Sequence, residues 1–95
     1  MKGLKNLLLE EQFRLERIIE ETKERLKQAP EGRLRLSKSH NHMQHYCCTE
    51  ENKSGYYISK ENIALARRLA QKSYDCKILQ LSEKRVAQIK KLVKD

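Results

Sequence analysis

Five side chains that can bind metals or act as nucleophiles lie within residues 40–48, and they are His40, His42, His45, Cys47 and Cys48. Imidazole and thiolate groups are preferred ligands of zinc and copper. Their spacing does not match a zinc site, because no second Cys or His pair lies at zinc-finger distance and Cys76 stands alone. Adjacent cysteines in a strand also point to opposite faces. We therefore expect no native metal site, and only adventitious, low-affinity binding by the histidines.

The same residues do not indicate catalysis. A Cys–His pair here has neither a third group to orient the histidine nor an oxyanion-hole signature. The glycines are Gly3, Gly32 and Gly55, so the chain has no Gly-rich phosphate-binding loop. We therefore expect that the chain is not an enzyme and binds no cofactor. The odd number of cysteines does not resemble a disulfide framework, which indicates reduced thiols. Because no signal-peptide pattern follows Met1 and Lys2, we expect a cytoplasmic setting.

Basic residues form a second group with a chemical interpretation. Arg33 and Arg35 alternate with leucines, so they share one face of an expected strand. Lys38 and Lys53 are expected in loops. A two- or three-stranded sheet can enter the major groove of DNA, where Arg pairs with guanine and Gln with adenine. The alternative is that both arginines are ordinary solvent-facing residues or pair with glutamates of the first helix. The candidates for sharing the arginine surface are Gln44, Tyr46 and Tyr57.

The charge distribution adds a basic helix to this group. The 95 residues hold 21 Lys and Arg against 13 Asp and Glu, a formal net charge of +8 at pH 7. Residues 60–95 hold ten of the basic and four of the acidic groups, and therefore carry +6. A basic helix can lie along phosphates, although such runs also serve simply as solvated faces. The predicted nucleic-acid-binding residues are Arg33, Arg35, Lys38, Gln44, Lys53, Tyr57, Arg67, Arg68 and Lys72.

Three segments that differ in composition must position these side chains. Residues 2–29 combine good helix formers with apolar residues at spacings of three and four, and Pro30 ends this amphipathic helix. Residues 33–58 alternate in polarity or form polar turns, which predicts a three-stranded antiparallel meander. Ser59 is a favoured N-cap for a second helix over residues 60–94. We predict a single small α+β domain over residues 1–95.

Alternation along the strands predicts which side chains are buried. Leu34 and Leu36 face the core in the first strand, whose polar turn begins near Ser39. In the third strand, Ile58 facing inward implies that Tyr56 faces inward and Tyr57 outward. For the middle strand, the pattern does not decide whether the odd-numbered or the even-numbered residues are buried. The stripe expected to be buried on the second helix is Ile63, Ala66, Leu69, Ala70, Tyr74 and Leu81, continued by Val86, Ile89 and Val93.

The composition leaves little material for a core. Hydrophobic residues make up 38% of the chain and charged residues 36%, so the core is expected to be lean. A helix over residues 60–94 would span about 50 Å, more than so small a domain can cover. We therefore expect a partner to complete the structure. Apolar runs are far shorter than the roughly 18 residues of a membrane span, so no membrane partner is expected.

Four stretches, at residues 29–37, 44–46, 55–58 and 69–75, carry a resemblance to known proteins. Through them the chain resembles, over nearly its whole length, the N-terminal region of an uncharacterised family of Firmicutes proteins. Longer members of that family look restriction-endonuclease-like in their C-terminal part. This sequence stops at Asp95, so the resemblance assigns no nuclease residue here. It departs from the family at His45, where relatives have a tyrosine. The resemblance implies the helix–sheet–helix layout and a bacterial cytoplasmic setting.

Two functional hypotheses follow. The first is a non-catalytic accessory module that binds DNA or RNA through the basic second helix and the strand face of Arg33 and Arg35. The second is a structural or oligomerising module whose long helices pair between chains, with the positive charge only aiding solubility. The expected partner is accordingly nucleic acid, a second copy of the chain or a missing C-terminal region.

Overall fold

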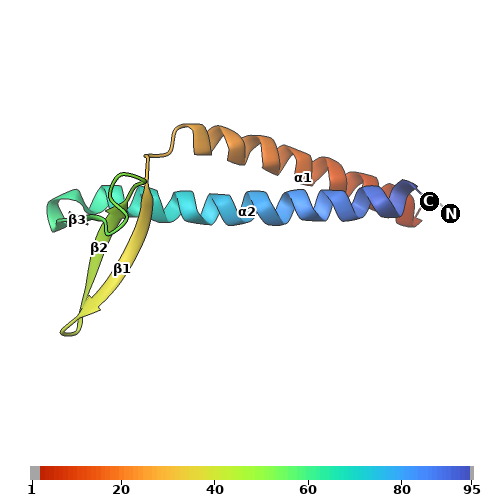
Figure 1. Cartoon of the computed structure of the whole chain (residues 1–95). Coiled ribbons are helices and arrows are strands. Elements are labelled where there is room, and N and C mark those ends of the chain that lie inside the picture. Colours follow the sequence, from red (N-terminus) through yellow and green to blue (C-terminus); the bar gives the residue numbers. More distant parts are fainter. Residues whose placement is uncertain (1–2, 95) are drawn as a thin grey trace. The chain divides into compact units, whose positions relative to one another are not determined.

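The computed structural model describes residues 3–94 (Figure 1). The three strands form one antiparallel sheet in the order β1-β2-β3. The predicted α+β arrangement of long helix, three-stranded sheet and long helix is confirmed. Met1, Lys2 and Asp95, which the predicted domain included, lie outside the described residues. The elements in chain order are α1 (Gly3–Lys27), β1 (Arg33–Ser39), β2 (His42–Cys48), β3 (Tyr56–Ile58), the short 3-10 helix η1 (Lys60–Asn62) and α2 (Ile63–Lys94).

The helix ends differ slightly from the predicted ones. α1 ends at Lys27 and not at residue 29, because Pro30 disfavours helical backbone in the residue before it. α2 begins at Ile63, after the turn of η1. Ser59 precedes η1 in extended conformation, but its side chain makes no capping hydrogen bond. Its backbone carbonyl instead accepts a hydrogen bond of 3.0 Å from the N–H of Asn62, so Ser59 occupies the predicted N-cap position, ahead of η1, without a capping side chain.

The chain divides into two compact units. The helical unit combines α1 with residues 75–94 of α2, and the sheet unit comprises residues 28–74. α2 therefore contributes its first turns to the sheet unit and its remaining turns to the helical unit. The prediction of a single domain over residues 1–95 stays a prediction.

The core of the helical unit is small and apolar. Leu15 of α1 packs with Val86 and Ile89 of α2, as the helical spacing predicts. Partly buried side chains surround these three, and they are Leu8, Ile18, Ile19 and Val93. Also on α1, Arg14 donates hydrogen bonds of 3.0 and 2.6 Å to the Glu11 carboxylate. These hydrogen bonds lower the pKa of Glu11 below its ordinary value.

An ion pair joins the two helices of this unit. Arg25 donates two hydrogen bonds of 3.3 Å to the carboxylate of Asp75, and its Nη2 also donates to the Thr22 hydroxyl at 3.1 Å. Asp75 is only 3% exposed and Thr22 is fully buried, whereas about half of the Arg25 side chain reaches solvent. The guanidinium thus brings a buried carboxylate and a buried hydroxyl together at the end of α1.

The buried stripe of α2 differs from the predicted one at its middle. Asp75 and Ser82 occupy buried positions, whereas Tyr74 and Leu81 are exposed. Apolar spacing alone predicts that the large side chains of Tyr74 and Leu81 are buried. The partner of Asp75 lies fifty residues away in the sequence, so the helical pattern could not reveal that a charged residue faces inward.

In the sheet unit, the β1–β2 hairpin is longer than predicted, because its polar turn is shorter than the sequence suggests. Ser39 pairs with His42, which leaves two residues, His40 and Asn41, in the turn. Both have positive φ, 48° and 68°, as in the type I′ turn whose twist matches that of the strands. Lys38 therefore lies within β1 and not in a loop, which corrects its predicted position.

The first turns of α2 cover one face of the sheet. Leu69, 1% exposed, packs with Ala66 and with Ile58 of β3. Leu34 and Cys47 border this cluster, and the register places both on the same face as Ile58. The odd-numbered residues of β2 consequently face the helix, which decides the orientation that the sequence left open.

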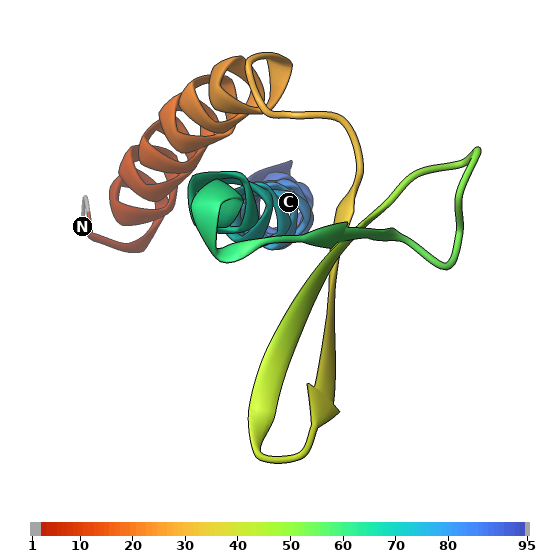
Figure 2. The same cartoon turned by 90° about the vertical axis from the view of Figure 1, so that its left-hand side faces the viewer.

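The helix covers less of this face than alternation implied. Leu36 and Tyr56 lie on the covered side but remain 53% and 56% exposed, so their predicted burial is wrong. Figure 2 shows the far half of the β1–β2 hairpin extending away from the start of α2. Alternation fixes the side of the sheet on which a residue lies, whereas burial also requires that the helix reach it.

We predict that Arg25→Ala lowers the free energy of unfolding by about 2 kcal/mol, because the buried Asp75 loses a charged partner. Lys27→Ala is the matched control. It removes another basic residue from the last turn of α1, one that pairs with the exposed Glu24, and should cost less than about 1 kcal/mol. Urea unfolding followed by circular dichroism measures both. Equal losses in the two variants would contradict a stabilising role for the Arg25–Asp75 pair.

Candidate nucleic-acid interface

Strand register gathers five of the chemically interesting side chains on one face of the sheet. Arg35 lies opposite Tyr46, which in turn lies opposite Tyr57 of β3. Gln44 and Arg33 are two residues away along β2 and β1, so they point to the same side. We name this surface the arginine face, and its members are Arg33, Arg35, Gln44, Tyr46 and Tyr57.

This face is the one that α2 leaves open. The helix packs on the side of Leu34 and Ile58, and alternation turns the arginine face the other way. One end of the face is covered by residues 49–55, and there Cys48 is buried. Three hydrogen bonds of 3.1 Å hold this loop: Asn52 donates its N–H to the Thr49 hydroxyl and accepts, through its carbonyl and its side chain, from Thr49 N–H and Gly55 N–H.

Arg35 is held flat against the sheet. Its Nε and Nη2 donate hydrogen bonds of 3.1 and 2.8 Å to the backbone carbonyl of Ser54 in the loop. The guanidinium carbon lies 4.3 Å from the centroid of the Tyr46 ring, within the range of a cation–π interaction. The loop and the tyrosine therefore fix the position of this charged group.

Tyr46 links the arginine to the other polar members of the face. Its hydroxyl donates a hydrogen bond of 3.0 Å to the Gln44 side-chain oxygen. Its ring meets that of Tyr57 in an edge-to-face arrangement, with centroids 5.7 Å apart and planes at 67°. Tyr57 remains 59% exposed, so it offers most of its surface to solvent.

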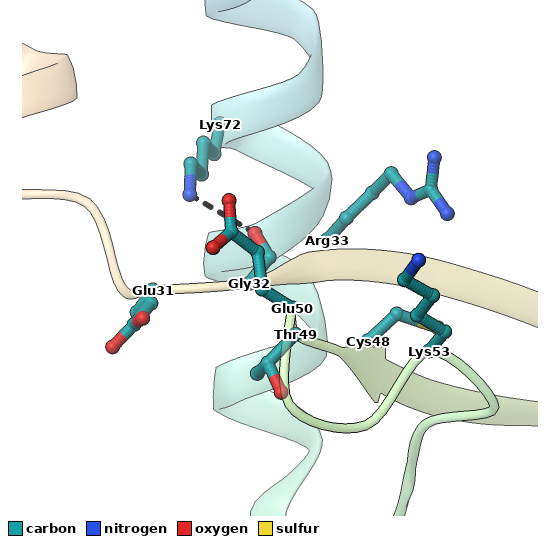
Figure 3. Close-up of a pocket in the computed structure, with 8 residues that line it drawn as sticks. All are labelled: Glu31, Gly32, Arg33, Cys48, Thr49, Glu50, Lys53 and Lys72. Atoms are coloured by element: carbon teal, nitrogen blue, oxygen red, sulfur yellow. Dashed lines mark hydrogen bonds between the residues drawn. The ribbon is translucent and has the colours of Figure 1, made fainter.

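A shallow hollow of about 460 Å³ adjoins the arginine face at the start of β1 (Figure 3). Arg33 and Lys53 lie at one side of it, and Lys72 of α2 lies at the other. The ammonium group of Lys72 donates hydrogen bonds of 3.0 Å to the carbonyls of Pro30 and Gly32. Lys72 thus holds the connection between α1 and β1, whereas Arg33 and Lys53 are exposed cations. Two acidic side chains, Glu31 and Glu50, also line the hollow.

The remaining predicted contact residues do not lie on the arginine face. Lys38 points to the opposite side of β1, because it is an odd number of residues from Arg33 and Arg35. Arg67 and Arg68 are exposed on α2, which packs on the other side of the sheet. Arg68 also donates a hydrogen bond of 3.1 Å to the Gln28 carbonyl. The nine predicted residues therefore divide between separate surfaces of the sheet unit.

The histidines and cysteines of residues 40–48 do not converge. His42 and His45 lie on opposite faces of β2, and His40 lies in the turn. Within residues 3–94 no three His, Cys, Asp or Glu side chains are arranged to hold a metal ion. All three cysteines are free, with Cys48 buried, Cys47 half-buried and Cys76 exposed.

Comparisons with known proteins identify no relative. No family model, curated protein or solved structure matches the chain. The resemblance to the Firmicutes family therefore stays a prediction. Between residues 3 and 94, neither helix has the length and apolar character needed to cross a membrane.

Tyr46 and the Ser54 carbonyl both hold Arg35 in place, and neither is among the nine residues predicted to contact nucleic acid. Tyr46 is one of the three candidates for the arginine surface, and no sequence pattern indicates the carbonyl of Ser54. A two-residue turn at His40 and Asn41 would have fixed the register and so placed Tyr46 opposite Arg35. The closure of the loop onto Arg35 has no comparable signal in the sequence.

We predict that Gly55→Ala destabilises the protein by about 1–3 kcal/mol. Gly55 has a φ of 101°, and an added Cβ would lie 2.9 Å from the Tyr46 Cβ and 3.1 Å from the Cys48 Sγ. Thermal unfolding tests this. Gly3→Ala is the matched control: it has open space around it at the start of α1, and it should leave stability unchanged or raise it by up to about 1 kcal/mol. Equal stability of Gly55→Ala and the parent would contradict the tight packing of the loop.

Proposed function

We propose that this chain is a non-catalytic module that binds nucleic acid through the arginine face. The observation that supports the proposal best is the register, which puts Arg33, Arg35 and Tyr57 together on the side of the sheet that α2 leaves open. Exposed cations beside an exposed aromatic ring match the two features that nucleic acids present, phosphates and flat bases.

The cations have separable roles in this proposal. Arg33 and Lys53 are exposed beside the hollow, and their long side chains can follow a phosphate backbone. Arg35 is fixed by Ser54 and Tyr46, so it presents a charge in one place at little entropic cost. The ten basic residues from Lys60 onward supply longer-range attraction, which raises the rate of encounter with a polyanion.

The resemblance noted in the sequence is compatible with this role. An N-terminal module in a family whose longer members look nuclease-like would hold nucleic acid while another region performs the chemistry. We therefore propose an accessory role in a bacterial cytoplasmic protein, with no catalytic residue in residues 3–94.

We predict that a fluorescently labelled oligonucleotide binds this protein in a salt-dependent manner, measured by fluorescence anisotropy at two salt concentrations. Arg33→Ala should weaken binding at low salt and reduce the slope of log affinity against log salt by about one, because one phosphate contact is lost. Lys38→Ala is the matched control, since it removes a cation from the opposite face of the same strand. Absence of binding at low salt, or binding indifferent to salt, would refute the proposal.

A second candidate function is self-association through the helices. The described residues bury seven apolar side chains and leave eleven large ones exposed, so more apolar surface is available than the core uses. Five of the exposed residues belong to the helical unit and are more than 60% exposed, and they are Leu4, Leu7, Phe13, Leu81 and Leu92. A second copy of the same helices offers a matching apolar surface.

We predict for this second function that light scattering shows a concentration-dependent rise in mass. Leu81→Glu should shift the protein towards the monomer, because it places a charge on an exposed apolar position of α2. Gln80→Glu adds the same charge at a neighbouring exposed position and should leave the mass unchanged. A monomer at every concentration would exclude this function.

A further inference from the structure

We infer that the nucleic acid recognised by the arginine face is single-stranded, and that one of its bases stacks on the ring of Tyr57. This inference rests on the proposed function. It specifies that the bound nucleic acid is single-stranded and that the ring of Tyr57 selects it. It concerns the sheet unit alone.

Two of the groups that would read a duplex, Arg35 and Gln44, are already engaged within the sheet unit. Recognition in the major groove requires Arg or Gln side chains that extend towards base edges. Arg35 directs its Nε and Nη2 to the Ser54 carbonyl and lies against Tyr46. The Gln44 side-chain oxygen accepts the Tyr46 hydroxyl proton. Both side chains are held against the sheet, so neither is extended in the way that groove readout needs.

The aromatic surface, in contrast, is available. Tyr57 is 59% exposed, and its ring is supported from one side by Tyr46. Because Tyr46 is itself fixed by Arg35 and Gln44, Tyr57 has a rigid neighbour and can receive a flat group with little reorganisation. Bases inside a duplex are stacked on one another, so a base that stacks on a protein ring comes from an unpaired strand.

The cations lie where the backbone of such a strand needs them. Arg33 is two residues along β1 from Arg35, a separation of about 7 Å on one face of a sheet. Lys53 borders the same hollow as Arg33 and immediately precedes Ser54, the residue that binds Arg35. A strand with a base on Tyr57 therefore has two exposed cations within reach for its neighbouring phosphates. Tyr46 acts here as a positioning residue and Tyr57 as the contact residue.

The sequence contains no tryptophan, so the fluorescence of one introduced indole reports on its position alone. Tyr57→Trp introduces a single indole at the proposed stacking position, and Tyr56→Trp introduces one at the adjacent exposed position on the opposite face. Each protein is titrated with an oligothymidylate of about 12 nucleotides and with a duplex of the same length, while indole fluorescence is recorded. An oligouridylate in a parallel titration distinguishes DNA from RNA as the preferred strand.

We expect the oligothymidylate to quench the fluorescence of Tyr57→Trp and to leave that of Tyr56→Trp nearly unchanged. The single strand should bind more tightly than the duplex. In the otherwise unaltered chain, Tyr57→Ala should weaken single-strand binding by about tenfold or more, and Tyr57→Phe should preserve it because the ring remains. Circular dichroism of each variant shows whether the fold is retained.

Two results overturn the inference in different ways. Binding of the duplex as tight as that of the single strand, or equal quenching at positions 56 and 57, would exclude base stacking on Tyr57 while leaving nucleic-acid binding intact. Failure of both ligands to bind at low salt would refute the proposed function itself.

Discussion

The sheet unit depends on the packing of Leu69 and Ala66 of α2 against Ile58 of β3. A three-stranded sheet cannot bury both of its faces in so small a unit, and this contact decides which face is buried. Because side chains alternate along a strand, burial of Ile58 assigns a side to every residue of β1 and β2. The exposed arrangement of Arg33, Arg35 and Tyr57 is thus a consequence of an apolar contact on the opposite face.

A second set of contacts converts that exposed face into an ordered surface. The loop at residues 49–55 closes over Cys48, and Gly55 allows the close approach to Tyr46 that a larger residue would prevent. Its Ser54 carbonyl then receives the Arg35 guanidinium. Without such a partner, a long basic side chain would sample many rotamers, and binding would have to order it. The loop at residues 49–55 therefore makes the interface rigid, because its Ser54 carbonyl oxygen holds the Arg35 guanidinium.

Much of the architecture could be predicted from local pattern, and the errors in predicted burial share one cause. Helical spacing, Pro30 and the alternation after Arg33 identify the elements, and Arg33, Arg35 and Tyr57 are correctly assigned to the outward side of the sheet. The errors involve partners distant in the sequence. Asp75 is buried because Arg25 reaches it, and Leu36 and Tyr56 are exposed because α2 ends its coverage before them. No local pattern contains that information. The fixed position of Arg35 escaped prediction for the same reason, since Ser54 lies nineteen residues away.

Because β3 is short, it limits intermolecular strand pairing at its edge of the sheet. β3 has three residues and pairs with residues 45–47 of β2, so this strand offers few free backbone donors and acceptors at its edge of the sheet. A long, flat edge strand is a template on which other chains can extend the sheet and begin to aggregate. β3 is too short to serve as such a template, whereas β1, the strand at the other edge of the sheet, has seven residues. On the β3 side, the sheet can keep an open face for a ligand while its border resists the growth of a continuous intermolecular ribbon.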